Sequence, residues 1–214
     1  YLDLYLLHSP KIDDLEANGD LLLTLETSKR EGKIRAYGIS ARTPSDALTA
    51  LNKFGFNVFE INFNLIDQRA LENGLFDRVV TEKLGLIIRT PLTFGFLTGK
   101  LRGDETFEGE DHRSNWPRSQ LIRWAQAHQE FSFLHDGKNR TPAQAAIRFC
   151  LDFEAVSTVI PGMLYTSEVV ENVKASDMHP LTPLEMDRIK HIYKEKVDAF
   201  YDRSFQKVPL DGNR

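Results

Sequence analysis

Residues 34–63 read IRAYGISARTPSDALTALNKFGFNVFEINF, and this stretch contains one complete strand-helix-strand unit. Its largely apolar ends, residues 34–40 and 57–63, predict two strands. Between them, Thr43 followed by Pro44 predicts the start of a helix, because threonine caps helix ends and proline fits the first helical turn. Two strands joined through a helix of about ten residues run parallel, so the stretch predicts a parallel βαβ unit.

The same alternation of strands and helices extends in both directions along the chain. Further strands are predicted at residues 2–8, 84–90 and 156–160, the first of them buried. Helices are predicted at residues 13–30, 44–53, 69–83, 119–134, 141–151, 167–175 and 182–197. The polar stretch 102–118 predicts a functional or mobile loop, and the tail after Phe200 an irregular segment.

About five βα units result, and on pattern alone they fit an open doubly wound α/β sheet and part of a (β/α)8 barrel equally well. No G-x-G-x-x-G turn follows any predicted strand, which weakens the assignment to a dinucleotide-binding open sheet.

Composition places the chain among globular proteins, since 41% of its 214 residues are hydrophobic, 27% are charged and the formal net charge is -4. The single cysteine, Cys150, cannot form an internal disulfide, which favours a reducing, cytoplasmic setting.

No apolar run reaches about 18 residues and Lys and Arg are scattered, so we expect neither a membrane span nor a nucleic-acid partner. Metal-ligand spacing is absent from the sequence, so no metal site is expected. The chain starts at Tyr1 inside a predicted strand, and the natural protein is therefore expected to begin further upstream.

Residues at the carboxyl ends of the predicted strands are the candidates for chemistry, because parallel α/β proteins bind ligands there. His8 can give a hydrogen bond or a proton to a carbonyl oxygen, or it is a buried histidine bonded to a neighbouring strand. Ser40 and Asn62 can bind an amide-bearing ligand or cap loops. The turn over residues 90–100 can hold a phosphate through backbone N–H groups and Lys100, or it is an ordinary tight turn.

Short segments spread in order along nearly the whole chain resemble the aldo-keto reductase superfamily. They are DLYLLH (3–8), EGKIRAYGIS (31–40), PL with G and LTGK within 91–100, GEDHRS (109–114), TPAQ (141–144), VIPG (159–162) and EN (171–172). The resemblance runs from the fourth strand of the family to its last helix. It implies a (β/α)8 barrel represented by about its last five βα units, as a single domain over residues 1–214 whose N-terminal units are absent from this chain.

The resemblance also implies an activity, the reduction of an aldehyde or ketone by hydride transfer from NAD(P)H. Of the catalytic tyrosine, lysine, aspartate and histidine of the family, only the histidine has a counterpart here, His8. The other three belong to the first three βα units of the family and are expected upstream of Tyr1. No tyrosine of this chain matches the tyrosine motif of the family, so no proton donor is assigned.

The same resemblance implies the cofactor contacts. Ser40 corresponds to the serine that holds the nicotinamide amide, whereas the asparagine after it is Ala41 and the glutamine that shares the amide is Glu60. The segment along the pyrophosphate comprises Pro91, Leu92, Gly95, Leu97, Gly99 and Lys100, and the pair that reads adenine is Glu171 and Asn172. Where relatives that prefer NADP carry cations for the 2'-phosphate, this chain has Gly162, Leu164 and Glu168, so both NADP and NAD stay open as the cofactor.

Two functions remain open at this point. The first is an oxidoreductase acting on a small carbonyl substrate, whose identity depends on variable loops. The alternative is a non-catalytic scaffold or regulatory subunit with weakened nucleotide binding, which the departures at Ala41, Glu60 and Glu168 motivate. Five βα units of a barrel would expose two sheet edges, so the chain alone is expected to be poorly soluble or a homo-oligomer.

Overall fold

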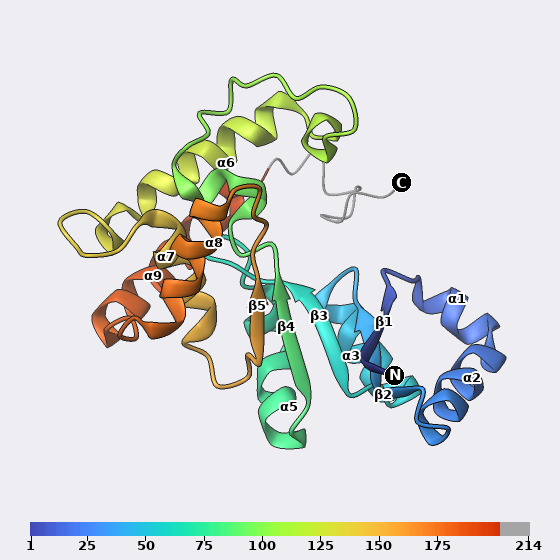
Figure 1. Cartoon of the computed structure of the whole chain (residues 1–214). Helices are drawn as coiled ribbons and strands as arrows, with labels where there is room; N and C mark the ends of the chain where they lie inside the picture. Colours follow the sequence, from blue (N-terminus) through green and yellow to red (C-terminus); the bar gives the residue numbers. More distant parts are fainter. Residues whose placement is uncertain (202–214) are drawn as a thin grey trace. The chain divides into compact units, whose positions relative to one another are not determined.

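The computed structural model describes residues 1–201 (Figure 1). Apart from Tyr201, the tail predicted to be irregular lies outside the described residues. The chain separates into two compact units, and each is described by itself. The first unit comprises residues 1–62, 69–89 and 154–158, and the second comprises residues 63–68, 90–153 and 159 onward.

Four parallel strands form the body of the first unit. They are β1 (Leu2–His8), β2 (Ile34–Ser40), β3 (Val58–Asn62) and β4 (Gly85–Arg89). The strands of the sheet follow the order β1-β2-β3-β4-β5, and the first unit ends at Thr158, the first residue of β5 (Thr158–Ile160). Ser157 is bonded to β4, because its backbone N–H donates to Leu86 O at 2.8 Å and its Oγ accepts from Leu86 N at 3.1 Å.

The predicted βαβ unit is confirmed. Helix α3 (Pro44–Phe54) joins β2 to β3 and packs on β3 (Figure 1). The predicted cap is also present, since Thr43 Oγ1 accepts from the backbone N–H of Asp46 at 3.1 Å. Gly55 ends the helix in the left-handed conformation, at a φ of 68°, which glycine adopts without steric cost.

Burial alternates along β4 and along β3 as far as Ile61, so the fully buried apolar side chains of these strands lie on one face of the sheet. Phe59 on β3 and Leu86 and Ile88 on β4 are fully buried. Because successive side chains of a strand point to opposite faces, Glu60 and Arg89 lie on the other face. The polar candidates on these strands are therefore separated from the apolar core between sheet and helices.

Two helices predicted in the first unit are interrupted. The first prediction, over residues 13–30, corresponds to α1 (Ile12–Ala17) and α2 (Gly19–Arg30). The second, over residues 69–83, corresponds to α4 (Arg69–Glu72) and α5 (Leu75–Glu82). The breaks fall at Asn18, with φ -123° and ψ 67°, and at Gly74, with φ 79°. Apolar residues recur at helical spacing on both sides of each break, so the pattern alone does not reveal them.

The prediction that β1 is buried is wrong. Leu2 and Tyr5 are 53% and 44% exposed, and His8 is exposed as well. Among the described residues β1 pairs with β2 only, which leaves its other edge open. A continuous apolar run is typical of a strand covered on both faces, but the run itself does not specify what covers it.

Helices dominate the second unit (Figure 1). Its elements besides the end of β5 are η1 (Thr93–Thr98), η2 (His112–Asn115), α6 (Arg118–Glu130), η3 (Ser132–Leu134), α7 (Pro142–Leu151), α8 (Thr166–Val173), η4 (Lys174–Asp177) and α9 (Pro183–Phe200). The helix predicted over residues 119–134 ends early, because Phe131 leaves helical angles with φ -105° and ψ 12°. Trp124, Phe96 and Phe149 are fully buried in this unit.

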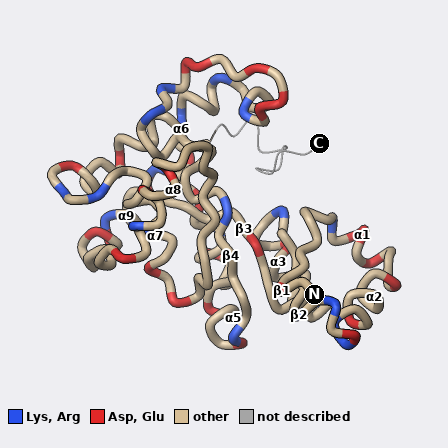
Figure 2. Tube along the Cα trace, in the orientation of Figure 1, with Lys and Arg blue, Asp and Glu red and all other residues tan. Residues whose placement is uncertain are grey.

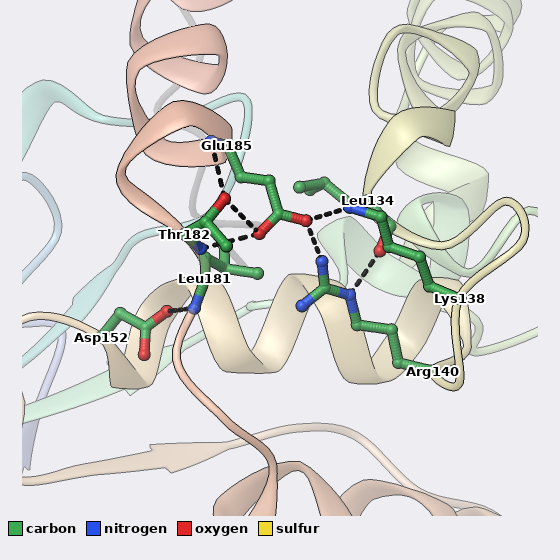
Figure 3. A network of polar contacts seen from close by, with 7 residues as sticks. All are labelled: Leu134, Lys138, Arg140, Asp152, Leu181, Thr182 and Glu185. Atoms are coloured by element: carbon green, nitrogen blue, oxygen red, sulfur yellow. Dashed lines mark hydrogen bonds and ion pairs between the residues drawn. The ribbon is translucent and has the colours of Figure 1, made fainter.

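The start of α9 is held by a buried carboxylate, Glu185 (Figure 3). It accepts hydrogen bonds from Thr182 N at 2.7 Å and Thr182 Oγ1 at 3.0 Å, and it forms ion pairs with Lys138 and Arg140. Burial alone would raise the pKa of Glu185, but the hydrogen bonds from Lys138 and Thr182 and the charge of Arg140 lower it to about 2. The network joins the segment before α7 to the first turn of α9.

The loop over residues 102–118 is held by its own side chains. Glu105 accepts from the backbone N–H groups of Arg102 at 2.7 Å and Gly103 at 2.9 Å. Arg113 forms an ion pair with Asp111 at 2.6 Å, and its guanidinium lies 4.2 Å from the ring centre of Phe107. Hydrogen bonds from Arg113 hold the pKa of Asp111 at about 2.

Two stacked histidines in the second unit predict a pH-dependent stability. The rings of His128 and His135 lie 5.2 Å apart at 16°, and neither Nε2 has a hydrogen-bond partner among residues 1–201. Burial, with His135 adding to it, lowers the pKa of His128 from its ordinary value of 6.5. As the pH falls, His128 therefore becomes protonated in the unfolded chain before it does so in the folded chain. His128 does not reduce the free energy of unfolding above pH 6.5, and it reduces it increasingly as the pH drops below 6.5.

We expect the melting temperature to fall between pH 7 and pH 5 and the fall to be smaller in His128→Phe, which keeps a ring at this position. Differential scanning calorimetry at both pH values measures it. The control is His191→Gln, because His191 is exposed on α9. Equal pH dependence in the wild type and in His128→Phe would show that His128 does not contribute.

Candidate active site

Three predicted site residues lie in one row across β1, β2 and β3, level with the carboxyl ends of β1 and β2, where His8 and Ser40 are the last residues. The strand register pairs His8 with Ser40 and Ser40 with Glu60. Side chains paired across neighbouring strands point to the same face, so the three share one face of the sheet. His8 is exposed, whereas Ser40 is 3% exposed. The row lies at the end of the sheet where parallel α/β proteins bind ligands.

A partly buried ion pair links this row to β4. Ser40 Oγ donates to Glu60 Oε1 at 2.7 Å, and Arg89 Nε lies 3.6 Å from the same oxygen. The side chains of Glu60 and Arg89 are 16% and 19% exposed, so water screens their charges only partly. Arg89 also donates from its second terminal nitrogen to the carbonyl oxygen of Ala41 at 3.2 Å.

Sequence reasoning missed Arg89. The only signal in the sequence is a cation directly after the apolar residues of a predicted strand. A charged residue at the end of a strand is common, so this signal does not indicate a site. Asn62, the other strand-end candidate of the first unit, is buried and pairs with Arg89 in the register.

In the second unit, the turn predicted to hold a phosphate has an unusual backbone. Thr90, Thr93 and Phe94 have positive φ angles of 59°, 46° and 56°, which side chains other than glycine rarely adopt. Such conformations cluster at ligand sites, where the surrounding structure enforces them. Thr93 is 3% exposed, and its Oγ1 has no hydrogen-bond partner in the part of the chain that the structure describes.

The other predicted residues of this turn divide into anchors and exposed groups. Pro91, Leu92 and Leu97 are buried, and Leu92 O accepts from the backbone N–H groups of Gly95 at 2.9 Å and Leu97 at 3.1 Å. Gly99 and Lys100 are exposed at the end of η1. Gly99, at a φ of 72°, lies so close to the ring of His128 that an added Cβ would be 2.7 Å from it.

Glu168 and Lys100 meet within the second unit. Their Oε1 and Nζ atoms are 3.7 Å apart, and Glu168 Oε2 accepts from the backbone N–H groups of Leu164 at 2.8 Å and Tyr165 at 3.4 Å. The hydrogen bond from Leu164 lowers the pKa of Glu168, against the effect of burial and with a contribution from Lys100. A fixed negative charge therefore stands at the start of α8, beside the cation of the turn.

The remaining candidates are placed less distinctively. The carbonyl oxygen of Glu171 accepts from Gln144 Nε2 at 2.9 Å, and Asn172 is buried in α8. Gly162 is in open space, with no heavy atom within 4 Å of the position of a Cβ. Within residues 1–201 no group of three or more His, Cys, Asp or Glu side chains is arranged to hold a metal ion. Figure 2 shows acidic and basic residues interspersed along both units.

Parallel strands in sequential order, connected through helices and carrying a row of polar side chains, define a parallel α/β fold. Residues 1–194 match the model of the Aldo/keto reductase family, and the chain belongs to this family. Its fold is the aldo-keto reductase fold, here with a five-stranded sheet. The resemblance found in the sequence is thereby confirmed.

Individual relatives agree with this assignment. A probable voltage-gated potassium channel subunit beta from Arabidopsis thaliana is 29% identical over 156 residues, which cover 70% of this chain and 48% of the relative. The uncharacterized oxidoreductase YqkF from Bacillus subtilis is 25% identical over 92% of this chain and 62% of the relative. The holo form of the aldo-keto reductase AKR11C1 from Bacillus halodurans is 25% identical with a TM-score of 0.66, over 90% of this chain and 61% of that structure. The chain thus spans about half to three fifths of the length of these relatives.

Proposed function

We propose that this chain forms the cofactor-binding part of an NAD(P)-dependent reductase that converts a small aldehyde or ketone to the alcohol. The row of His8, Ser40 and Glu60, which lie side by side on adjacent strands, carries the proposal, together with membership of the family. In the complete protein the described sheet belongs to a single (β/α)8 barrel domain that includes residues 1–214. The protein is proposed to be cytoplasmic, without membrane or nucleic-acid partners, and to form homo-oligomers. Among the described residues, no helix is long and apolar enough to cross a membrane.

Each of the two units offers groups that a nicotinamide dinucleotide requires. Ser40 Oγ and Glu60 offer hydrogen-bonding groups to the carboxamide at the row. In the second unit, the buried hydroxyl of Thr93 has no partner within the described residues and sits in a turn with a strained backbone and Lys100 at its end. A diphosphate satisfies such a hydroxyl and balances such a cation. Pro91, Leu92, Gly95, Leu97 and Gly99 shape this turn, and Gly162, Glu168, Glu171 and Asn172 are proposed for the adenosine end.

In the proposed reaction the bound cofactor supplies the hydride. His8 lies at the end of β1 in the same row as Ser40, so its imidazole can donate a hydrogen bond to the oxygen of the substrate carbonyl and orient it. Ser40 and Glu60 hold the carboxamide and thereby fix which face of the ring is presented. The described residues assign no proton donor to this step.

Binding of the cofactor tests the proposal directly. Trp116 and Trp124 lie within the second unit, so their fluorescence is expected to be quenched as NADH or NADPH is added to the 214-residue chain, with saturation. The proposal is wrong if neither nucleotide binds saturably to folded protein, as judged by circular dichroism of the same sample.

The fixed charge of Glu168 predicts that NADH binds more tightly than NADPH, because a carboxylate repels a 2'-phosphate. In Glu168→Gln the amide oxygen still accepts from Leu164 N, but the charge is gone, and we expect NADPH to bind about tenfold more tightly while NADH changes little. Fluorescence titration of both nucleotides measures the ratio. Glu195→Gln, an exposed position on α9, is the control. An unchanged ratio would place the 2'-phosphate away from Glu168.

A second candidate function is a non-catalytic subunit of a larger assembly. Two relatives, from Arabidopsis thaliana and Oryza sativa, are probable voltage-gated potassium channel beta subunits, each 29% identical to this chain. Glu60 and Ala41 in the row are compatible with a protein that binds nucleotide without turning it over. Saturable NADH binding by the natural full-length protein, with no oxidation of NADH in the presence of a panel of aldehydes and ketones, would favour this role.

A further inference from the structure

We propose that Arg89 is a positioning residue that holds Glu60 as a fixed acceptor, so that the row selects a primary amide and rejects the corresponding acid. This inference rests on the proposed function, since the amide is that of the nicotinamide ring. It assigns to the ion pair between β3 and β4 a role in ligand selection.

The geometry gives each group of the row a defined hydrogen-bonding sense. Ser40 Oγ donates its only proton to Glu60 Oε1 at 2.7 Å, so toward a ligand the hydroxyl can act only as an acceptor. The carboxylate of Glu60 is likewise an acceptor. Two acceptors side by side complement the two N–H bonds of a primary amide nitrogen. A ligand carboxylate has no N–H to offer and brings a second negative charge to Glu60.

Arg89 keeps this arrangement in place from the neighbouring strand. Its Nε lies 3.6 Å from the same Glu60 oxygen that Ser40 binds, and its second contact, to Ala41 O at 3.2 Å, fixes the guanidinium at the end of β2. The carboxylate is largely buried, and a buried carboxylate without a partner is costly. The guanidinium of Arg89 therefore stabilises the carboxylate of Glu60. The glutamine that the family has at this position is uncharged and needs no counter-ion.

The backbone of Ala41 also takes part in the arrangement. The backbone N–H of Ala41 donates to Glu60 O at 2.8 Å and its carbonyl oxygen accepts from Arg89, so both of its backbone groups are used within the row. A methyl side chain adds no donor or acceptor there. Ala41 and Glu60, two departures from the family pattern, are thus both in contact with Arg89.

The test compares the dissociation constants of NAD⁺ and of nicotinic acid adenine dinucleotide, which differ only in the amide and the acid. We expect the wild type to bind the amide form at least about tenfold more tightly. Glu60→Gln, which introduces a donor, and Arg89→Met, which releases the carboxylate, should each reduce this ratio toward one. Arg89→Lys, which keeps the positive charge, should restore part of it.

A double-mutant cycle separates positioning from folding. If Arg89 acts through Glu60, then Arg89→Met lowers the ratio in the wild type and leaves it unchanged in Glu60→Gln. Arg78→Met, which removes an exposed ion pair on α5 in the same unit, is the control and should leave the ratio unchanged. A ratio near one in the wild type, or equal effects of Arg89→Met in both backgrounds, would overturn the inference. Failure of both nucleotides to bind would instead contradict the proposed function.

Discussion

Replacing Glu185 by alanine is expected to lower the free energy of unfolding by about 3–5 kcal/mol, the range measured when one partner of a buried ion pair is removed. Glu185 is 7% exposed and faces two cations, of which Arg140 is itself largely buried (Figure 3). The change leaves Arg140 and Lys138 without their anion. It also removes the acceptor of Thr182 N, so the first turn of α9 loses its capping box.

The carboxylate of Glu185 also predicts that the second unit loses stability at acidic pH. Its pKa is about 2 in the folded chain and about 4.5 in the unfolded chain, so the stabilisation is complete above pH 4.5 and is lost as the pH falls toward 2. Urea unfolding of the wild type and Glu185→Ala at pH 7 and pH 3 measures both effects, and the difference between the two proteins should shrink at pH 3. Glu195→Ala, which removes an exposed i,i+4 pair with His191, is the control. A difference between wild type and Glu185→Ala that stays below about 1 kcal/mol at pH 7 would contradict the prediction.

Replacing Gly38 by alanine is expected to destabilise the first unit by about 3 kcal/mol, through overpacking between two strands. A Cβ at Gly38 would collide with the carbonyl oxygen of Val58 and would lie 2.8 Å from its Cβ. Val58 is the first residue of β3, and its backbone belongs to the sheet, so the strands must move apart instead. Gly38 stands two residues before Ser40 on the same face, and the shift should therefore lengthen the Ser40–Glu60 hydrogen bond and weaken NADH binding as well.

Gly19→Ala is the matched control for Gly38→Ala. Gly19 begins α2, has no heavy atom within 4 Å of the position that a Cβ would take, and has no positive φ. Alanine there should leave stability unchanged or raise it by up to about 1 kcal/mol. Chemical denaturation with NADH titration on the same samples measures both variants. Gly38→Ala with wild-type stability would mean that β2 and β3 separate at little cost.

Local signals predicted the elements of this fold well. The apolar runs of β2, β3 and β4, the Thr-Pro cap of α3, and the row of His8 with Ser40 follow from spacing and from the rule that ligands bind at strand ends. The breaks within two helices were missed because the apolar pattern continues across them, although each falls at an Asn-Gly dipeptide, Asn18-Gly19 and Asn73-Gly74, which is a turn signal. The exposure of β1 depends on neighbours that its own residues do not specify.

The contents of the candidate site were predictable only in part. Glu60 was visible as a departure from a family pattern, but the charge that accompanies it, Arg89, lies on another strand further along the chain. Register decides which residues of two strands share a face, and register depends on tertiary contacts. The close approach of Gly38 to Val58 also depends on register and was not predictable, since each of the two residues taken alone is ordinary in a strand.

The bond between Ser157 and β4 has a consequence for synthesis. Leu86 and Ser157 are 71 residues apart, and about half of the second unit lies between them in the chain. A ribosome adding about 5–20 residues per second therefore needs several seconds after releasing β4 before it delivers the segment that pairs with Leu86. During that interval the nascent sheet presents an unpaired backbone edge at β4. An open strand edge of this kind is a template for pairing with another chain.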